Sequence, residues 1–284
     1  MEYISIVQVI IVLYKTKIQD SKSYITLQES LSDNKQKIDL IIYDNSPDYN
    51  KDYKNINSFY FNTTYIPDYN NSGVSKAYNT AFNIAKDNNK KYLLLLDQDT
   101  DIPINFIHEL VNSINLGYDL IFPFLISNNQ VISPCNFRFG RGSVLKKKHF
   151  HPGIHKLKNI NFLNSGAIVS LDVFEKVGGY DLRLPLYYSD FNFFNRVKKI
   201  TTTYYSMNVN CYHEMSSNDT SDLEKFNFRF KCYCEGAIKC YDDIGGKLIM
   251  LFNIFARTLI LSIKLKTTLL IKTSIKTVYD NFNN

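Results

Sequence analysis

The chain has 284 residues, a formal net charge of +6 and a hydrophobic fraction of 45%. These values exclude a disordered chain and allow one sizeable domain, or one domain with an appendage. The charge is too low to indicate a nucleic-acid partner, and the five cysteines lack the paired spacing of a zinc site. The apolar run 4–13 has no basic segment before it and no cleavage site after it, so we expect a strand rather than a signal peptide.

Apolar runs and helical spacing predict the elements of the first half. Strands are expected at 6–13, 38–43, 58–61 (weaker) and 92–96, and helices at 21–33 and 73–85. This order of elements is typical of an α/β protein with parallel crossovers. Ligands of such sheets bind beyond the carboxyl ends of the strands, which directs attention to the acidic residues there.

The second half gives weaker patterns. Helices are expected at 103–111, 173–177 and 189–199, an irregular basic region at 119–158 and a core segment at 162–172. Beyond about Ser217 the chain becomes rich in helices without alternating strands. We therefore predict two parts, a catalytic domain over 1–217 and a C-terminal helical segment over 218–284.

Two carboxylates follow the strongest predicted strand. Asp97 and Asp99 stand one residue apart at its end, in the segment Leu96-Asp97-Gln98-Asp99-Thr100. Such oxygens can hold Mg²⁺ or Mn²⁺, which complete their shells with phosphate oxygens. An ordinary surface turn is the alternative, because Asp is common in turns.

Polar residues also follow or precede other predicted elements. Asp44 ends the second strand, where it could contact a base or ribose or form a local Asx turn. Gly73 permits a tight entry into the next helix, after Asn71 and before Lys76 on the first turn. An anion site and a plain helix start are both compatible with that pattern.

Two further residues are candidates for chemistry. Asp190 lies among apolar neighbours at a predicted helix start, where it could be an N-cap or a general base with a raised pKa. His213 lies in a Cys-Tyr-His-Glu segment, and a lone histidine is more often structural than a ligand.

Taken in order, these segments resemble glycosyltransferase family 2, whose members have the GT-A fold, over about Ile4 to Ser216. Leu96 to Asp99 is similar to a Leu-Asp-Gln-Asp segment of its rhamnosyltransferase-like, polysaccharide-assembly branch. The resemblance implies a mixed, mainly parallel sheet flanked by helices, here with a C-terminal helical extension.

The resemblance also implies roles for individual residues. Asp190 corresponds to the catalytic base, and Asp97, Asp99 and His213 to the metal and diphosphate site, with Asp99 the more direct ligand. Donor-binding positions are Asp44, Asn71, Gly73, Lys76, Asp97, Asn164, Gly166 and Arg196. The family's usual acidic neighbour of the base is missing, because Ser189 and Asn192 occupy those positions.

The implied enzyme is an inverting, Mg²⁺- or Mn²⁺-dependent transferase. It moves a sugar from a UDP- or dTDP-linked donor to an acceptor, which we expect to be a lipid-linked saccharide of a bacterial surface polysaccharide (O-antigen or capsule). Two alternatives are a sugar-nucleotide nucleotidyltransferase, which the glycine-free segment after the first strand disfavours, and a non-catalytic carbohydrate-binding protein.

The C-terminal run 248–275 is apolar but interrupted by basic residues. Arg257, Lys264, Lys272 and Lys276 fall on one side of a helix, and Lys266 does not. This pattern favours a basic amphipathic helix lying on an anionic membrane surface, at the cytoplasmic face of the bacterial plasma membrane. A helix packed on the catalytic domain is the alternative.

Overall fold

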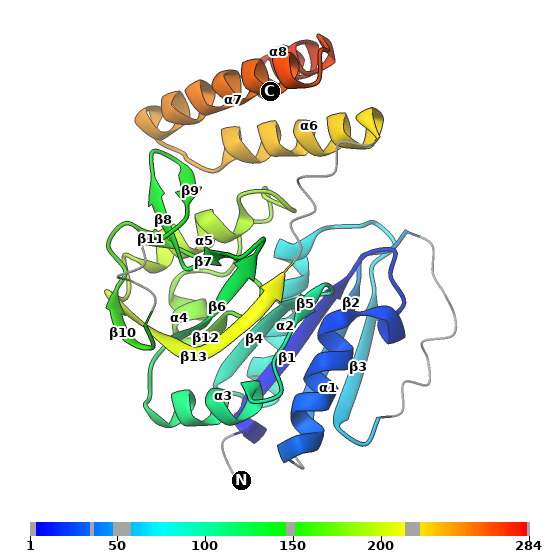
Figure 1. The fold of residues 1–284 in the computed structure, drawn as a ribbon, viewed down its shortest axis with the longest axis vertical. Helices are drawn as coiled ribbons and strands as arrows, with labels where there is room; N and C mark the ends of the chain where they lie inside the picture. Colours follow the sequence, from blue (N-terminus) through cyan, green and yellow to red (C-terminus); the bar gives the residue numbers. More distant parts are fainter. Residues whose placement is uncertain (1–3, 35–36, 48–57, 146–150, 214–221, 283–284) are drawn as a thin grey trace.

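The computed structural model describes residues 4–34, 37–47, 58–145, 151–213 and 222–282 (Figure 1). Its main element is a ten-stranded mixed sheet, and a small three-stranded sheet lies beside it. In the main sheet the strand order is β10 (Gly153–Lys156), β13 (Thr203–His213), β6 (Leu120–Ser127), β12 (Ile168–Ser170), β4 (Tyr92–Asp97), β1 (Val7–Leu13), β2 (Ile38–Asp44) and β3 (Phe61–Pro67). Two short strands, β5 (Thr100–Asp101) and β7 (Gln130–Ser133), pair with β13 and β6. The small sheet has the order β11 (Ile160–Asn161), β8 (Cys135–Arg138) and β9 (Arg141–Ser143).

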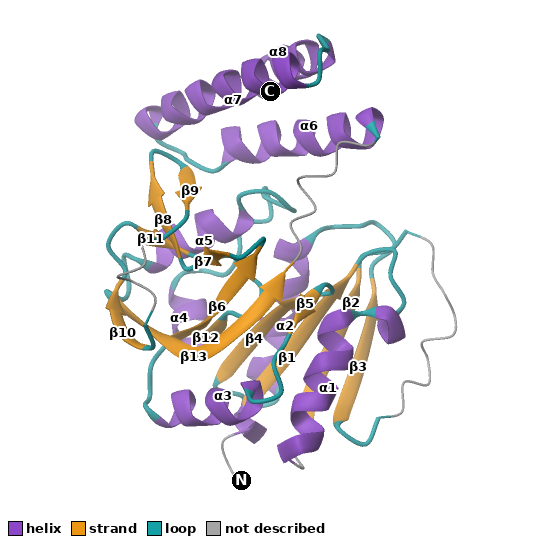
Figure 2. Ribbon diagram, in the orientation of Figure 1, coloured by secondary structure: helices purple, strands orange, loops and turns teal. Residues whose placement is uncertain are grey.

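Helices cover both faces of the main sheet (Figure 2). Those of the described chain are α1 (Lys22–Asn34), α2 (Val74–Asp87), α3 (Phe106–Asn115), α4 (Leu171–Lys176), α5 (Ser189–Val197), α6 (Leu223–Lys239), α7 (Ile244–Lys264) and α8 (Leu269–Phe282), with short 3₁₀ turns at Ile4–Ile6 and Ile18–Asp20.

The central strands are buried on both sides, which explains their continuous apolar sequences. In β1, Val9 and Ile11 face the core under α1 and α3, and Ile10 faces the core under α2, α4 and α5. The strands β4, β1, β2 and β3 run parallel, so their carboxyl ends lie along one edge of the sheet. Strand β12 is antiparallel to both of its neighbours, β4 and β6.

The last three helices form a layer beyond the carboxyl ends of the parallel strands (Figure 1). Their shared core also includes Leu184 and Tyr188, from the segment that leads into α5. The C-terminal helices therefore pack onto the part of the catalytic domain that carries Asp190. The predicted boundary at 217/218 lies outside the described residues and stays a prediction.

The structure confirms the α/β fold and most predicted elements. Strands at 6–13, 38–43 and 92–96 correspond to β1, β2 and β4, and helices at 21–33 and 73–85 to α1 and α2. The weaker strand expected at 58–61 is wrong, because β3 begins at Phe61 and continues to Pro67. This strand lies at the edge of the sheet, where partly exposed polar side chains replace the apolar run of a central strand.

The irregular region expected at 119–158 is also wrong. It contains β6, an almost wholly buried strand of the sheet, followed by β7, β8, β9 and β10. Pro123 breaks the strand signature of β6, since proline removes a ladder donor. The long strand β13 was not predicted at all.

The single C-terminal helix expected over 248–275 is two helices. Helix α7 ends at Lys264, and Lys266 adopts a left-handed conformation with φ 49°. The Thr267 N–H then donates to the Ser262 carbonyl at 3.1 Å, a helix-ending pattern that turns the chain into α8. Among the helices of the described residues, α7 is the one that is long and apolar enough to cross a membrane by length and composition, and 28% of its 18-residue apolar stretch is buried.

Candidate active site

Strand register brings two predicted site residues to one edge of the sheet. Asp44 pairs with Leu13 across β2 and β1, and Asp97 pairs with Val12 across β4 and β1. One strand therefore separates the two carboxyl-bearing ends, which places their backbones about 10 Å apart. That spacing leaves room for a ligand to lie across the end of β1.

The turn that carries Asp97 and Asp99 is held by hydrogen bonds from three other segments. The Gln98 side chain accepts the Tyr14 N–H at 2.8 Å, after β1. Ser23, at the start of α1, accepts the Thr100 N–H at 3.0 Å and contacts the Asp97 carbonyl through its hydroxyl. These bonds hold the backbone of the turn in place. The carboxylates of Asp97 and Asp99 are therefore not needed for that purpose.

Segment 164–166 also contacts the turn that carries Asp97 and Asp99. The Ser165 hydroxyl accepts the Asp97 N–H at 3.1 Å and lies 2.5 Å from the Thr100 hydroxyl. Gly166 has a φ of +80°, and a Cβ there would lie 2.7 Å from Pro123. Because only glycine fits that approach, Gly166 fixes the course of the segment beneath Asp97.

The environment of Asp97 is suited to a positive charge. Burial raises the pKa of its carboxyl, the neighbouring Asp99 raises it further, and His213 lowers it. The Tyr78 hydroxyl donates to Asp97 Oδ1 at 3.1 Å. A recessed carboxylate beside a second carboxylate is electrostatically costly, and a bound cation would relieve that cost.

Asp99 and His213 complete this group. Strand β13 pairs with β5 so that His213 lies opposite Thr100, and His213 Nδ1 is 3.3 Å from Asp99 Oδ1. The Asp99 side chain is 41% exposed, which leaves its oxygens accessible. Two carboxylates and an imidazole fit Mg²⁺ or Mn²⁺ chemically. No three His, Cys, Asp or Glu side chains of the described residues are already gathered in the geometry of a metal site.

The Asp44 side of the edge is organised by a residue that the sequence analysis missed, Asp68. Asp44 accepts hydrogen bonds from Tyr65 and from the Ser46 N–H. Asp68 accepts from the Tyr43 hydroxyl at 2.9 Å and from the Ser72 N–H at 3.0 Å. These bonds lower the Asp68 pKa against the opposing effect of burial. An aspartate ahead of Asn-Asn-Ser is a turn signal that could have identified it.

Gly73 joins the Asp44 side of the sheet edge to the segment before α5. It has a φ of +90°, and a Cβ there would lie 2.2 Å from the Pro185 carbonyl oxygen. The Val74 N–H donates to that oxygen at 2.8 Å, so the first amide of α2 is already used. Asn71, with a φ of 49°, and Lys76, exposed on the first turn of α2, lie on either side. Donor contacts by Asn71, Gly73 and Lys76 stay predictions.

Asp190 lies on the first turn of α5, two residues after a tyrosine with an unusual backbone conformation. Tyr188 is the N-cap in a left-handed conformation, φ 66°, which is rare for a tyrosine and typical of strained functional sites. Asp190 Oδ1 accepts the Phe191 N–H at 2.7 Å. Burial raises the Asp190 pKa to about 7, and the negative charge of Asp97 contributes. The residue as a whole is only partly buried, so it is not sealed off from solvent.

Two buried tyrosines lie between Asp97 and Asp190. Burial raises the pKa of Tyr78 and of Tyr180, and both carboxylates add to each shift. The rings of Tyr78 and Tyr180 have centroids 5.1 Å apart. Asp97 and Asp190, from β4 and α5, therefore lie near the same two tyrosines.

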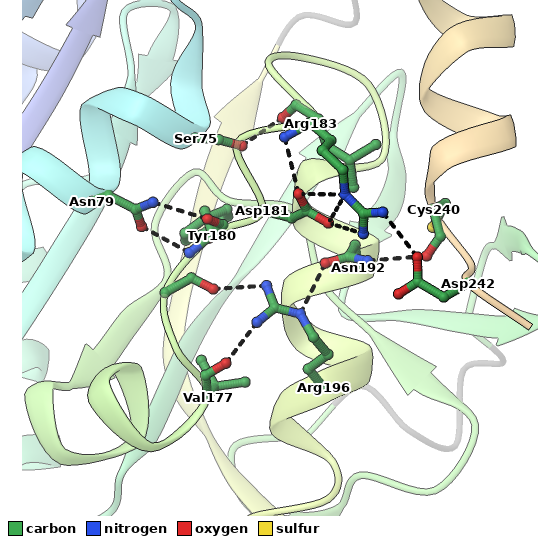
Figure 3. Close-up of polar contacts among 12 residues, drawn as sticks. Ser75, Asn79, Val177, Tyr180, Asp181, Arg183, Asn192, Arg196, Cys240 and Asp242 are labelled. Atoms are coloured by element: carbon green, nitrogen blue, oxygen red, sulfur yellow. Dashed lines mark hydrogen bonds and ion pairs between the residues drawn. The ribbon is translucent and has the colours of Figure 1, made fainter. Parts of the chain in front are cut away.

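Tyr180 is itself fixed in place. Asn79 of α2 exchanges two hydrogen bonds with its backbone, at 2.8 and 2.9 Å (Figure 3). Its ring stacks on Phe193 at 4.1 Å, and its hydroxyl donates to Asn164 Oδ1 at 2.7 Å. Asn164 is thus oriented by Tyr180, and a donor contact by Asn164 stays a prediction.

Arg196 braces the loop before Asp190. Its guanidinium donates to the carbonyls of Val177 and Gly179, both at 2.7 Å, and to Asn192 Oδ1 at 2.9 Å (Figure 3). The structure shows this positioning role, and donor contact by Arg196 stays a prediction.

The same network reaches the C-terminal layer. Asn192 Nδ2 donates to the Cys240 carbonyl at 3.0 Å, directly after α6. Arg183 bridges Asp181 and Asp242, at 2.6 and 2.9 Å. The family resemblance predicts an acidic residue near Asp190. At one of the expected positions the chain instead has Asn192, whose amide connects α5 to the C-terminal helices.

Comparisons with solved structures place this arrangement among known folds. The chain is similar to S. aureus TarS 1-349 (15% identity, TM-score 0.53, 86% of this chain and 69% of that one) and to the same protein in complex with UDP-GlcNAc (15%, 0.56, 96% and 80%). It is also similar to GalNAc-T7 with UDP, GalNAc and Mn²⁺ (12%, 0.56, 88% and 54%). At these identities the likeness shows the fold, which is GT-A.

Among curated proteins the chain has no significant sequence match. The model of "Glycosyl transferase family 2" matches residues 20–177, which is more than half of the 284 residues and includes Asp44, Asp97, Asp99, Asn164 and Gly166. The chain therefore belongs to glycosyl transferase family 2.

Proposed function

We propose that this glycosyltransferase moves one sugar from a UDP- or dTDP-sugar to an acceptor hydroxyl, with inversion at the anomeric carbon. The observation that carries the proposal is that Asp97 and Asp190, from separate elements, lie near the same two buried tyrosines, and that the charge of Asp97 raises the pKa of Asp190. Membership of the family favours sugar transfer over the nucleotidyltransferase and carbohydrate-binding alternatives.

The donor side is the edge formed by β1, β2 and β4. Asp44 and the loop ordered by Asp68 face the position of a base or ribose, and the Asp97–Asp99 turn faces the diphosphate. Related folds have been solved with UDP and with UDP-GlcNAc, which supports a nucleotide-sugar donor here.

We assign Asp99, Asp97 and His213 to a Mg²⁺ or Mn²⁺ site. The fit rests on two neighbouring carboxylates, one of them recessed, and on the imidazole beside Asp99. The structure of GalNAc-T7 with Mn²⁺ is consistent with it. When bound, the ion supplies positive charge to the diphosphate that leaves.

On the acceptor side, Asp190 is the general base. Its carboxylate takes the proton of the acceptor hydroxyl, whose oxygen forms a bond to the anomeric carbon on the face opposite the diphosphate. The bond between that carbon and the diphosphate oxygen breaks, and the electron pair leaves with the nucleotide. Tyr180 and Arg196 hold the loop before Asp190 in position.

We further propose that the acceptor is a lipid-linked saccharide of a bacterial surface polysaccharide, and that the protein lies peripherally on the cytoplasmic face of the plasma membrane. Support comes from the outer face of α7, where large apolar side chains are exposed. These are Ile244, Leu248, Phe252, Phe255, Leu259, Ile260 and Ile263. The exposed Lys264, Lys266, Lys272 and Lys276 at the end of α7 and on α8 favour an anionic surface.

Substituting Asp190→Asn tests the base. Transfer should fall roughly 10²- to 10⁴-fold because the amide accepts no proton, while the donor Kd stays nearly unchanged. The wild-type kcat/KM should rise with pH through about 7, since the base must be ionised. The melting temperature at pH 8 should not fall, because ionised Asp190 destabilises the folded state when its pKa is raised. Asp172→Asn, an exposed aspartate on α4, is the control. A fully active Asp190→Asn enzyme contradicts the assignment.

Chelation tests the cation. Excess EDTA should reduce transfer on the order of 10²-fold or more, and Mn²⁺ or Mg²⁺ should restore it, because several kcal/mol of leaving-group stabilisation are lost. Asp99→Asn should raise the Mn²⁺ concentration needed for half-maximal transfer. Undiminished transfer in EDTA would exclude the metal site.

Substituting exposed apolar residues of α7 tests whether this helix binds the membrane. The double substitution Leu248→Glu and Phe252→Glu should abolish co-sedimentation with vesicles of phosphatidylcholine and phosphatidylglycerol, because both side chains, 61% and 72% exposed, would enter the interface. Leu116→Glu, at a leucine that is 56% exposed directly after α3, should have no effect. If the double variant binds vesicles as the wild type does, α7 is not the membrane surface.

A further inference from the structure

The hairpin of β8 and β9 has a strained aromatic residue at its tip. Arg138 pairs with Arg141, so the loop between the strands is only Phe139 and Gly140. Both loop residues have a positive φ, 51° and 71°, as a type I′ turn requires. Such turns favour Asn or Asp before Gly, because a bulky side chain is strained at a positive φ. Phe139 is nevertheless 77% exposed, so folding gains little apolar burial in return for the strain.

The hairpin belongs to a strongly basic part of the chain. Residues 120–171 contain seven Lys or Arg and no Asp or Glu. Arg138 and Arg141 are exposed on either side of the tip, and within the described part of the chain neither forms an ion pair with an acidic residue. Like charges that face each other across a strand pair are destabilising. An exposed ring between two such arginines fits a partner with an apolar interior and a negatively charged surface.

The tip is anchored to α7, and Figure 1 shows the hairpin reaching that helix. Asn253, buried on α7, donates from Nδ2 to the Phe139 carbonyl at 2.7 Å. The Asn253 carbonyl accepts from the Arg141 guanidinium at 3.4 Å. Gly140 packs so closely on Met250 that a Cβ at this glycine would collide with the methionine sulfur. The position of Phe139 is therefore fixed relative to α7.

The side of α7 that anchors the hairpin continues into the exposed apolar face of the helix. Ile249 and Ile260 lie four residues before and seven residues after Asn253, which places all three on one side of the helix. Both isoleucines are exposed, Ile260 by 63%, and Phe252 next to Asn253 is exposed as well. Phe139 therefore lies beside the face of α7 that we assign to the membrane.

The base of the hairpin packs near Asp190. A Cβ at Gly142 would lie 3.1 Å from the ring of Phe191, the residue directly after Asp190. The Phe137 ring also packs on Phe191, with centroids 4.8 Å apart. Gly142 is three residues from Phe139, so their Cα atoms are at most about 11 Å apart. A surface bound at the tip is therefore close to the candidate base.

We propose that the β8–β9 hairpin is a second membrane contact, in an inference that rests on the proposed location of the protein at a membrane. The Phe139 ring enters the lipid interface, and Arg138 and Arg141 bind anionic headgroups around it. The hairpin and the outer face of α7 together fix the orientation of the Asp190 site relative to the bilayer.

A tryptophan at the tip reports directly on this contact. The chain contains no tryptophan, so Phe139→Trp introduces a single fluorescent reporter. On vesicles of phosphatidylcholine and phosphatidylglycerol its emission should shift to shorter wavelength and should be quenched by lipids with brominated acyl chains. Phe59→Trp is the matched control, at a phenylalanine that is 81% exposed before β3, near the amino ends of the parallel strands. Its emission should not change.

Two further variants separate the apolar and the charged contributions. Phe139→Asn should weaken binding to the same vesicles about 10-fold or more, because burial of the ring is lost. Its melting temperature should not fall, since Asn adopts a positive φ more readily than Phe. Arg138→Gln should weaken binding to the anionic vesicles about 5-fold and leave binding to pure phosphatidylcholine unchanged. Lys176→Gln, at an exposed lysine on α4, is the charge control and should change neither value.

Unshifted Phe139→Trp emission in a protein that still co-sediments with vesicles would overturn the inference and leave α7 as the membrane face. A shift that appears without vesicles as the protein concentration rises would also overturn it, because the tip would then contact a second copy of the chain. Wild-type protein that binds no vesicles contradicts both membrane contacts.

The outcomes also separate this inference from the proposed function. If the wild type transfers no sugar but Phe139→Trp inserts into vesicles, the transferase function fails and the hairpin contact stands. If the double variant Leu248→Glu and Phe252→Glu binds vesicles as the wild type does and Phe139→Asn binds weakly, the α7 face fails and the hairpin contact stands.

Discussion

The site depends on the electrostatic proximity of two carboxylates that the fold brings from different elements. Asp97 ends β4 and Asp190 lies on the first turn of α5, and the negative charge of Asp97 adds to the effect of burial in raising the pKa of Asp190. The protein maintains this unfavourable pair with a rigid frame around it. Ser23, Ser165 and Gln98 hold the Asp97 turn, and Tyr180 and Arg196 hold the loop before Asp190. Such a pair can do two things chemically: Asp97 can bind a cation, and Asp190 can accept a proton.

The C-terminal helices extend that frame instead of forming an independent appendage. Tyr188 belongs to their core and is also the strained N-cap of the helix that carries Asp190. Asn192 and Arg183 add polar bonds between the two parts. Consequently, the helix α7, with its exposed apolar face, belongs to the same packed layer that holds the segment before Asp190. This coupling gives a structural reason for an amide at Asn192.

Sequence patterns predicted the buried parallel strands and the acidic residues at their ends, because both follow from local composition and from the geometry of parallel sheets. They failed where tertiary context decides. Pro123 concealed β6, exposed polar residues concealed the edge strand β3, and the left-handed Lys266 divided the C-terminal helix. Asp68 orders its loop by accepting a hydrogen bond from Tyr43, and Arg196 holds the loop before Asp190 by donating to the Gly179 carbonyl. Both partners are distant in sequence, so local patterns did not reveal these contacts. The order of the motifs indicated a common site for Asp97 and Asp190, and only the structure showed that both lie near the packed rings of Tyr78 and Tyr180.

The most direct measurement of that convergence is the pKa of Asp190 itself, followed by carboxyl ¹³C NMR in the wild type and in Asp97→Asn. In the wild type the pKa should be near 7, and it should fall in the variant, because a negative charge next to Asp190 has been removed. An Asp190 pKa that is the same in both proteins would show that the two carboxylates do not lie close together.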